Sequence, residues 1–198
     1  DFVGIFTAMK GLPVTIRLID PPLHEFLPHD EKSQADMAKA LGVSVEKVKR
    51  RVSMLHEANP MLGHRGCRLC VTYPEILDMQ VRALVEATIE CLRSKIKAMP
   101  EIMIPLVGTK KELVVLRAET EAIIAKVRQE QDYKPRLDIK IGTMIEVPRA
   151  AVTADEISEA ADFFSFGTNS LTQMTFGYSR DDVNNFLPDY LQGELLPA

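Results

Sequence analysis

Short apolar runs alternate with longer helical patterns along this chain, and this alternation limits the possible folds more than any other feature. Because strands that alternate with helices predict βαβ units, we expect an α/β fold with a parallel sheet. Near-continuous apolar and β-branched residues are typical of buried parallel strands. The strand-like runs are residues 14–19 (VTIRLI), 101–107 (EIMIPLV), 139–147 (IKIGTMIEV) and 163–166 (FFSF).

The segments between these runs carry signals for helix starts and ends. Residues 33–58 predict two helical stretches that break at Gly42 and Val43, with Ser44 as the N-cap of the second. Asn59 and Pro60 are expected to close that helix. Later segments have the spacing of a capping box, in which two side chains satisfy free N–H groups at a helix start. These pairs are Thr72 and Glu75, Thr109 and Glu112, Thr153 and Glu156, and Ser170 and Gln173.

A parallel sheet with helices on one side suits a (β/α)8 barrel of the TIM type, in which functional residues follow the carboxyl ends of the strands. A complete barrel takes about 250 residues, whereas this chain has 198. We therefore expect one partial barrel domain over residues 1–198, with part of the barrel missing at both ends. The alternative is an open sheet.

The distribution of charge argues against some functions. The formal net charge is −4, and Lys and Arg are scattered among acidic residues, so we expect no face that binds nucleic acid. No apolar run approaches the roughly 20 residues that cross a bilayer, and the first residues lack a secretory signal pattern. We expect a soluble intracellular protein with no membrane partner.

The cysteines Cys67, Cys70 and Cys91 are odd in number, which disfavours a disulfide framework and indicates a reducing compartment. Cys67 and Cys70 have CxxC spacing, but no second Cys or His pair lies at a zinc-ligand spacing near them. A redox pair should follow a strand, whereas this pair is expected in a basic loop after Gly63. We interpret the cysteines as buried or incidental thiols.

Charged and polar residues gather where the expected strands end. One guanidinium group can donate two parallel hydrogen bonds to the oxygens of a phosphate or carboxylate. A helix N-terminus adds backbone N–H donors, and Glu146 is a candidate ligand of Mg²⁺. The set therefore predicts a site for an anionic substrate. Its members are Arg17, Asp20, His64, Arg65, Glu146, Gly167, Thr168, Asn169 and Ser170.

Each charged residue also has a structural interpretation. Arg17 could be a surface residue of an edge strand, and Arg65 and Arg68 could be solvated loop charges. Glu146 could cap a neighbouring helix. Spacing alone leaves these alternatives open.

Distinctive stretches carry a resemblance over about the whole chain: GLPVTIRLIDPPLHEFLPH, NPMLGHRGCRL followed by VTYPEI, EIMIPLVGTKKEL, IGTMIEVPRAA and FFSFGTNSLTQMTFGYSRDD. They resemble the phosphoenolpyruvate/pyruvate-binding barrel of the pyruvate, phosphate dikinase family. Phosphoenolpyruvate synthases and Enzyme I of the sugar phosphotransferase system share the elements that correspond to NPMLGHR and FGTNS. The stretch DPPLHEFLP favours the dikinases over both.

The resemblance implies roles for individual residues. Arg17 and Arg65 look like catalytic arginines that clamp the phosphoryl and carboxylate groups of the substrate. Glu146 looks like a Mg²⁺ ligand that also contacts substrate. The remaining substrate contacts are expected at the last strand-to-helix turn, at Gly167, Thr168, Asn169 and Ser170.

The resemblance also implies an activity. A phosphohistidine on another domain of the same parent chain passes its phosphoryl group to pyruvate and gives phosphoenolpyruvate. The overall reaction is ATP + pyruvate + phosphate = AMP + phosphoenolpyruvate + diphosphate. Residues 1–198 alone are expected to be inactive. A homodimer and a cytoplasmic location are implied as well, with plastid and glycosome as alternatives.

Three features depart from the family pattern. Ser170 stands where the family has an Asp that gives the metal its second carboxylate, so Mg²⁺ should bind more weakly, although Ser170 remains a suitable N-cap. The family's proton-donating Cys lies in a segment downstream of residue 198. Another substrate-binding Arg of the family lies upstream of Asp1.

One favoured function and two alternatives therefore remain. We favour a part of a pyruvate, phosphate dikinase. The alternative is a stand-alone, catalytically inactive domain that binds phosphoenolpyruvate or a partner protein. The alternative enzyme is a phosphoenolpyruvate synthase or an Enzyme I-like phosphotransferase.

Overall fold

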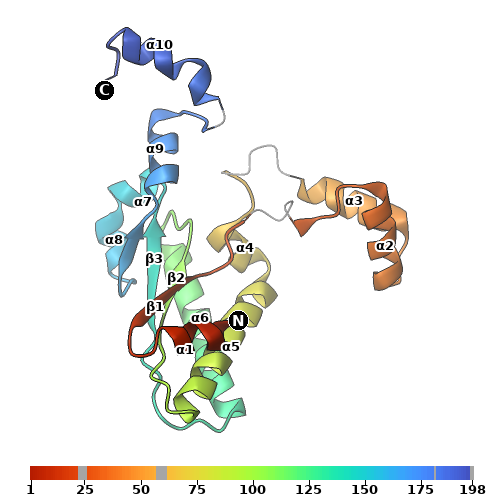
Figure 1. The fold of residues 1–198 in the computed structure, drawn as a ribbon, viewed down its shortest axis with the longest axis vertical. Helices are drawn as coiled ribbons and strands as arrows, with labels where there is room; N and C mark the ends of the chain where they lie inside the picture. The colour runs from red at the N-terminus through yellow and green to blue at the C-terminus, as the bar shows by residue number, and fades with distance from the viewer. Residues whose placement is uncertain (22–25, 57–61, 181, 197–198) are drawn as a thin grey trace.

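Parallel strands form one sheet whose spatial order, β1-β2-β3-β4, is also their order along the chain. The computed structural model describes residues 1–21, 26–56, 62–180 and 182–196. The sheet curls and helices cover one side of it, as in part of a (β/α)8 barrel, so the predicted fold class is confirmed (Figure 1). The strands are β1 (Pro13–Arg17), β2 (Met99–Ile104), β3 (Lys140–Ile145) and β4 (Phe164–Phe166).

All the predicted strands are present, but three of them end earlier than the apolar runs suggest, at Arg17, Ile104 and Ile145. Leu18 and Leu106 continue these runs beyond the strands and are buried at 1% and 3% exposure. Burial therefore extends past the hydrogen-bonded ladder, into the turns that follow the strands.

The prediction that the last strand is buried is wrong. Phe164 and Ser165 are only partly buried, and Phe166 is 64% exposed. Within the described residues β4 pairs only with β3, so it lies at the edge of the sheet.

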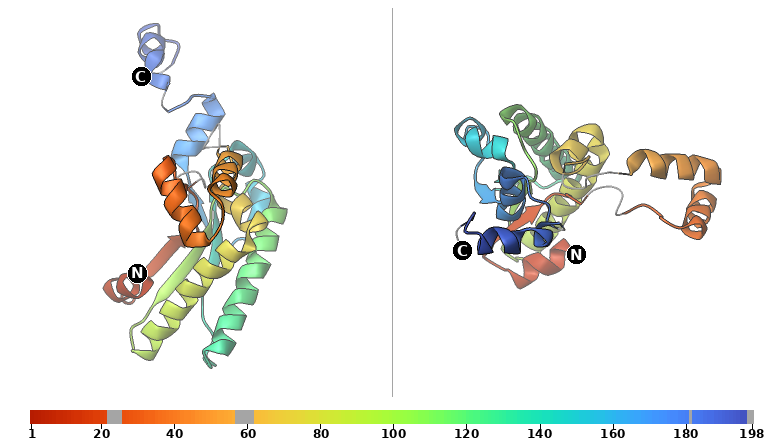
Figure 2. Two further views of the ribbon diagram at one scale, coloured as in Figure 1. Left: turned by 90° about the vertical axis from the view of Figure 1, so that its right-hand side faces the viewer. Right: turned by 90° about the horizontal axis from the view of Figure 1, so that it is seen from above.

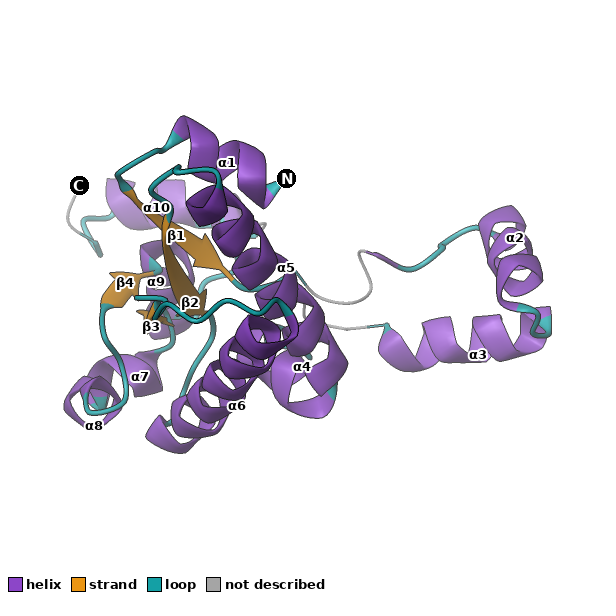
Figure 3. Cartoon of the chain, turned by 90° about the horizontal axis from the view of Figure 1, so that it is seen from below, coloured by secondary structure: helices purple, strands orange, loops and turns teal. Residues whose placement is uncertain are grey.

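Three helices, α1 (Phe2–Ala8), α5 (Pro74–Arg93) and α6 (Lys110–Glu130), pack on one side of the sheet (Figure 3). One face of each long helix is apolar, with the spacing of an amphipathic helix. Together with strand residues these faces form the hydrophobic core. The core includes Leu77, Val81, Leu84 and Ile89 of α5, Leu113, Leu116 and Val127 of α6, and Ile102, Ile104, Ile141 and Ile145 of the sheet.

The helices α2 (Glu31–Leu41) and α3 (Val45–Leu55) form a hairpin that projects away from the sheet (Figure 2). The predicted break is confirmed, because Gly42 ends α2 with φ +65° and the Ser44 side chain accepts the Lys47 N–H. The predicted closure at Asn59 and Pro60 lies outside the described residues.

Of the predicted capping boxes, the one at Thr109 is confirmed. The Thr109 hydroxyl accepts the Glu112 N–H at 3.4 Å, and Glu112 Oε2 accepts the Thr109 N–H at 2.9 Å. The same Oε2 also accepts the Gly108 N–H at 2.9 Å. These bonds satisfy N–H groups that the first turn of α6 leaves free.

The capping box predicted at Thr72 is wrong, because Thr72 is the last residue of α4 (Gly66–Thr72). Its hydroxyl donates to the Arg68 carbonyl of the same helix at 3.0 Å. Helix α5 begins directly at Pro74, whose missing N–H suits the first helical position.

The capping box predicted at Thr153 is also wrong. Thr153 lies between α7 (Pro148–Val152) and α8 (Ala154–Ser158), and its hydroxyl donates back to the Arg149 carbonyl at 3.0 Å. The Thr153 side chain thus bonds to the preceding helix α7, whereas the sequence pattern assigns it to α8.

The carboxyl-terminal region contains α9 (Thr168–Phe176), the 3₁₀ helix η2 (Val183–Asn185) and α10 (Leu187–Gln192). Phe176, Tyr178, Phe186 and Tyr190 contact one another in series, with ring centroids 5.0 to 5.5 Å apart. Among the described residues, no helix has both the length and the apolar character needed to cross a membrane.

We predict that Thr109→Ala lowers the free energy of unfolding by about 1 kcal/mol, because it removes the N-cap side chain of α6. Denaturant unfolding of the chain measures this. Thr153→Ala is the matched control, since the Thr153 side chain caps no helix. Equal losses in the two variants would contradict the assigned role of Thr109.

Candidate functional site

The carboxyl ends of the strands lie at one end of the parallel sheet, where α4 and α9 also begin (Figure 1). Arg17 is the last residue of β1, Glu146 follows β3, and Gly167 follows β4. The sequence predicts that side chains at these positions meet. The described contacts bring most of them together.

Asp20 is the centre of this cluster, and it is only 1% exposed. Its Oδ2 accepts hydrogen bonds from Arg17 Nη1 at 3.0 Å and from Arg65 Nη2 at 2.6 Å. Arg65 Nε lies 3.2 Å from Asp20 Oδ1 and 3.1 Å from the Asp20 carbonyl oxygen. One buried carboxylate therefore orients two guanidinium groups from distant parts of the chain.

Gly66 allows this close approach at the start of α4. Its φ is +57°, a left-handed conformation that favours glycine. A Cβ at this position would lie 2.8 Å from Leu106 Cβ and 3.0 Å from Asp20 Oδ1. Any other residue would push α4 away from the cluster that Arg65 joins.

Glu146 is also buried, at 3% exposure. Its Oε1 accepts the Leu106 N–H at 2.7 Å, and Leu106 itself has φ +63°, which is uncommon outside glycine. Burial raises the pKa of the Glu146 carboxyl, and the nearby Asp20 carboxyl adds to this, while Leu106 N–H, Arg17 and Arg65 oppose it.

The interpretation of Glu146 as a cap of a neighbouring helix is wrong, because its bonded partner belongs to the turn after β2. The turn after β2 links Glu146 to the arginine cluster, because Leu106 bonds Glu146 and also lies against Gly66, which adjoins Arg65. Sequence patterns give no sign of the part that Leu106 plays, since only its backbone contacts Glu146.

Gly167 packs against Glu146 from the other side. A Cβ on Gly167 would lie 2.5 Å from Glu146 Cβ and 2.9 Å from its Oε2. The Gly167 N–H donates to the Ile145 carbonyl at 3.0 Å, which continues the ladder by one bond. Here the absence of a side chain lets the backbone approach Glu146 closely.

The prediction that Ser170 is the N-cap of the last predicted helix is wrong. Helix α9 begins at Thr168, Gly167 takes the N-cap position, and Ser170 is the third helical residue. Thr168 and Asn169 are exposed in the first turn, whereas Ser170 is half-buried. A capping-box spacing thus placed the N-cap three residues too late, at Ser170 instead of Gly167.

The structural interpretations of the three arginines have different outcomes. Arg17 is on an edge strand and 41% exposed, as the structural interpretation has it, yet it is paired with Asp20. Arg65 is only 19% exposed, so it is no solvated loop charge. Arg68 Nη1 donates to the carbonyls of Leu62 and Gly63, both at 2.9 Å.

Among the contacts described, none joins His64 to the cluster of Arg17, Asp20 and Arg65. It bonds the Thr72 hydroxyl and stacks on Tyr73, with ring centroids 5.5 Å apart. Tyr73 also accepts a hydrogen bond from Arg51 of the projecting hairpin, at 2.8 Å. His64 therefore helps to organise the junction of α4 and α5.

The interpretation of the cysteines as buried thiols is confirmed, but the predicted loop position of Cys67 and Cys70 is wrong, since both lie on α4. Burial raises the pKa of Cys67 to about 12 and that of Cys70 to about 11. Cys67 Sγ donates to the Leu106 carbonyl at 3.2 Å. Thiols held protonated in this way are poor nucleophiles.

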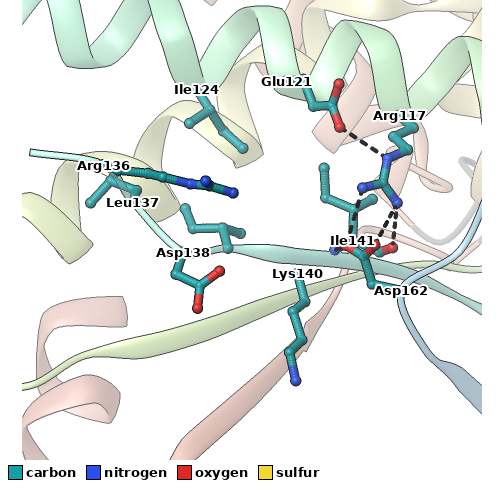
Figure 4. A pocket seen from close by; sticks show the side chains of 10 residues that line it. Arg117, Glu121, Ile124, Arg136, Leu137, Asp138, Lys140, Ile141 and Asp162 are labelled. Carbon is teal, nitrogen blue, oxygen red and sulfur yellow. Dashed lines mark hydrogen bonds and ion pairs between the residues drawn. The ribbon is translucent and has the colours of Figure 1, made fainter.

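A cavity of about 480 Å³ lies elsewhere, at the amino ends of β3 and β4 (Figure 4). Arg117 bonds Asp162 and Glu121 there, and its Nη1 also donates to the Ala160 carbonyl at 3.0 Å. These bonds tie α6 to the turn before β4. The cavity is at the opposite end of the strands from Asp20 and Glu146.

The strand-end cluster can hold a small anion with several oxygens. Arg17 and Arg65 supply N–H donors from two directions, and Asp20 fixes both. Among the described residues no group of three or more His, Cys, Asp and Glu could hold a metal ion. Glu146 alone, with oxygens of a bound anion, still suits Mg²⁺, which often takes one or two carboxylates plus substrate oxygens.

The chain is an α/β barrel fragment, and its arginines and buried carboxylates lie at the strand ends, where barrel enzymes have their active sites. A family model, "PEP-utilising enzyme, PEP-binding domain", matches residues 1–197. The chain belongs to this family of phosphoenolpyruvate (PEP)-utilising enzymes.

Relatives in this family include pyruvate, phosphate dikinases from bacteria and plants. The chain is 54% identical to that of Clostridium symbiosum over 98% of its own length and 22% of the relative. It is 56% identical to the chloroplastic enzyme 1 of Oryza sativa subsp. japonica, over 99% of its length and 21% of the relative. The chain thus spans about a fifth of these relatives.

We predict that Glu146→Gln makes the chain more stable at pH 7. Because the folded-state pKa of Glu146 lies above 4.5, the folded chain binds this proton more tightly than the unfolded chain. Binding of this proton therefore stabilises the folded chain. The stabilisation is complete below pH 4.5 and is lost as the pH rises through the folded-state pKa of Glu146.

Denaturant unfolding at pH 7 and near pH 4 measures the effect. The Gln variant should exceed the original chain at pH 7 and approach it near pH 4. Glu156→Gln, at an exposed position of α8, is the control. A Glu146→Gln variant that is less stable at pH 7 would contradict the role of burial.

Proposed function

We propose that residues 1–198 are part of the pyruvate- and PEP-binding barrel domain of a pyruvate, phosphate dikinase. The supporting observation is the Asp20-centred pair of arginines beside the buried Glu146, in a chain 54% identical to a dikinase. In the proposed reaction, the enolate oxygen of pyruvate attacks the phosphorus of a phosphohistidine on another domain of the parent chain. The O–P bond forms, the P–N bond breaks, and histidine leaves.

The proposal assigns Arg17 and Arg65 to the phosphoryl and carboxylate oxygens. Phosphoryl transfer depends mainly on positioning and charge stabilisation, which these guanidinium groups would provide. Gly167, Thr168, Asn169 and Ser170 are proposed to contact substrate where α9 begins. The exposure of Thr168 and Asn169 leaves them accessible to a ligand.

We propose that Glu146 holds Mg²⁺ together with substrate oxygens. A bound cation would neutralise charge on the phosphoryl group and the enolate. The raised pKa of Glu146 is consistent with this, because a buried carboxylate with a raised pKa gains from a cation beside it.

The parent enzyme is proposed to act in the cytoplasm as a homodimer. The matched relatives include a bacterial enzyme, while others are named chloroplastic, so plastid remains the alternative compartment. Exposed apolar residues on α6, Val114 and Val115, offer one surface that a second copy would cover.

We predict that Arg17→Ala or Arg65→Ala weakens PEP binding to the parent enzyme by at least about 100-fold. For Arg65, which is 19% exposed, the loss of one partner from a largely buried charge pair costs roughly 2–5 kcal/mol. Nucleotide-driven phosphorylation of the histidine domain should continue unchanged, because it needs neither residue. Calorimetry and the two partial reactions, measured separately, test this.

Arg93→Ala, at the end of α5, is the matched control, since the described contacts of Arg93 are with Gln131 and the Tyr133 ring. Loss of both partial reactions in the Arg17 and Arg65 variants would instead indicate a structural role. Unchanged PEP binding would contradict the proposed function.

A second prediction concerns Ser170, which supplies a hydroxyl where the family has a carboxylate. We expect Ser170→Asp to bind Mg²⁺-oxalate, a mimic of enolpyruvate, about tenfold more tightly or better, because a second carboxylate adds a preferred ligand. Ser170→Asn is the isosteric neutral control. Equal affinities of the Asp and Asn variants in calorimetry would rule out a metal-directed role for this position.

A further inference from the structure

Gln80 of α5 binds the backbone at the end of β1 through both ends of its side-chain amide. Its Oε1 accepts the Ile19 N–H at 2.7 Å, and its Nε2 donates to the Arg17 carbonyl at 3.4 Å. Gln80 is half-buried, between the exposed Met79 and the buried Val81. No sequence pattern singles out this residue.

The backbone groups that Gln80 binds flank a hydrogen bond that joins the end of β1 to β2. Leu18 N–H donates to the Met103 carbonyl of β2 at 2.9 Å, so it points toward β2. The Arg17 carbonyl and the Ile19 N–H, on either side of this bond, are bound by Gln80 instead. Gln80 thus satisfies two backbone groups at the point where β1 ends.

The position of this short segment decides the geometry of the arginine cluster. Arg17 carries one guanidinium, and Asp20, directly after Ile19, orients that guanidinium and the one of Arg65. Leu18, between the two groups bound by Gln80, is 1% exposed and anchors the segment in the core. A shift of the backbone here moves both Arg17 and Asp20.

We propose that Gln80 is a positioning residue for the substrate clamp. It holds the backbone on both sides of Leu18, so that Asp20 meets Arg17 and Arg65 in the geometry that binds PEP. This inference rests on the proposed function, because the clamp is assigned to PEP there. Gln80 itself touches no substrate.

The test uses the full-length parent enzyme with Gln80→Met, which keeps the side-chain length and removes both hydrogen bonds. PEP affinity in the presence of Mg²⁺ should fall about 10- to 100-fold, since the loss of one hydrogen bond from a charged clamp lowers affinity by about this factor. Hydrogen exchange of the segment 13–20 should become faster. Nucleotide-driven histidine phosphorylation should be unchanged, which shows that the other domains are intact, and slow exchange of the core helices α5 and α6 shows that the barrel domain is folded.

Two further variants separate positioning from a general effect on stability. Gln80→Glu keeps an acceptor for the Ile19 N–H, the shorter of the two bonds, and should lose less PEP affinity than Gln80→Met. Gln129→Met makes the same chemical change at an exposed position of α6 and should have no effect.

The possible outcomes distinguish the inference from the function beneath it. Faster exchange in Gln80→Met with unchanged PEP affinity would overturn the positioning role and leave the proposed function intact. An equal loss of affinity in Gln129→Met would overturn it as well. If the original enzyme does not bind PEP, the proposed function fails, and this inference fails with it.

Discussion

The shared carboxylate of Asp20 is the interaction on which the rest of the site depends. It joins the end of β1 to the start of α4, although Asp20 and Arg65 are 45 residues apart. The projecting α2–α3 hairpin lies within that interval. The Asp20–Arg65 pair therefore joins the two ends of the segment that contains the hairpin. A buried carboxylate needs such partners, because an unpaired charge away from water is costly.

Glu146 forms the second half of the site, and its position depends on backbone rather than on charge. Leu106, in a left-handed conformation, directs its N–H to Glu146, while its carbonyl accepts the Cys67 thiol. Gly66 and Gly167 let the neighbouring backbone approach where a Cβ would collide. Local strain of this kind persists only where surrounding packing compensates for it.

The fold and the approximate place of the site were predictable from sequence because both follow local rules. The alternation of strands and helices predicted a parallel sheet. Parallel strands bring Arg17, Glu146 and Gly167 to one end of that sheet. The predictions failed where neighbouring segments compete. Thr72 and Thr153 bond back into preceding helices, and α9 starts before Ser170.

The sequence by itself determined the α/β class, the parallel sheet, the burial of the thiols and most of the strand-end residues from which the candidate site is built. Only the tertiary structure decided which of them touch. Asp20 pairs with Arg65 across a long insertion, and Gln80 binds a strand that no spacing connects with it. Periodicity and capping report interactions a few residues apart, whereas these contacts depend on how distant segments pack against one core.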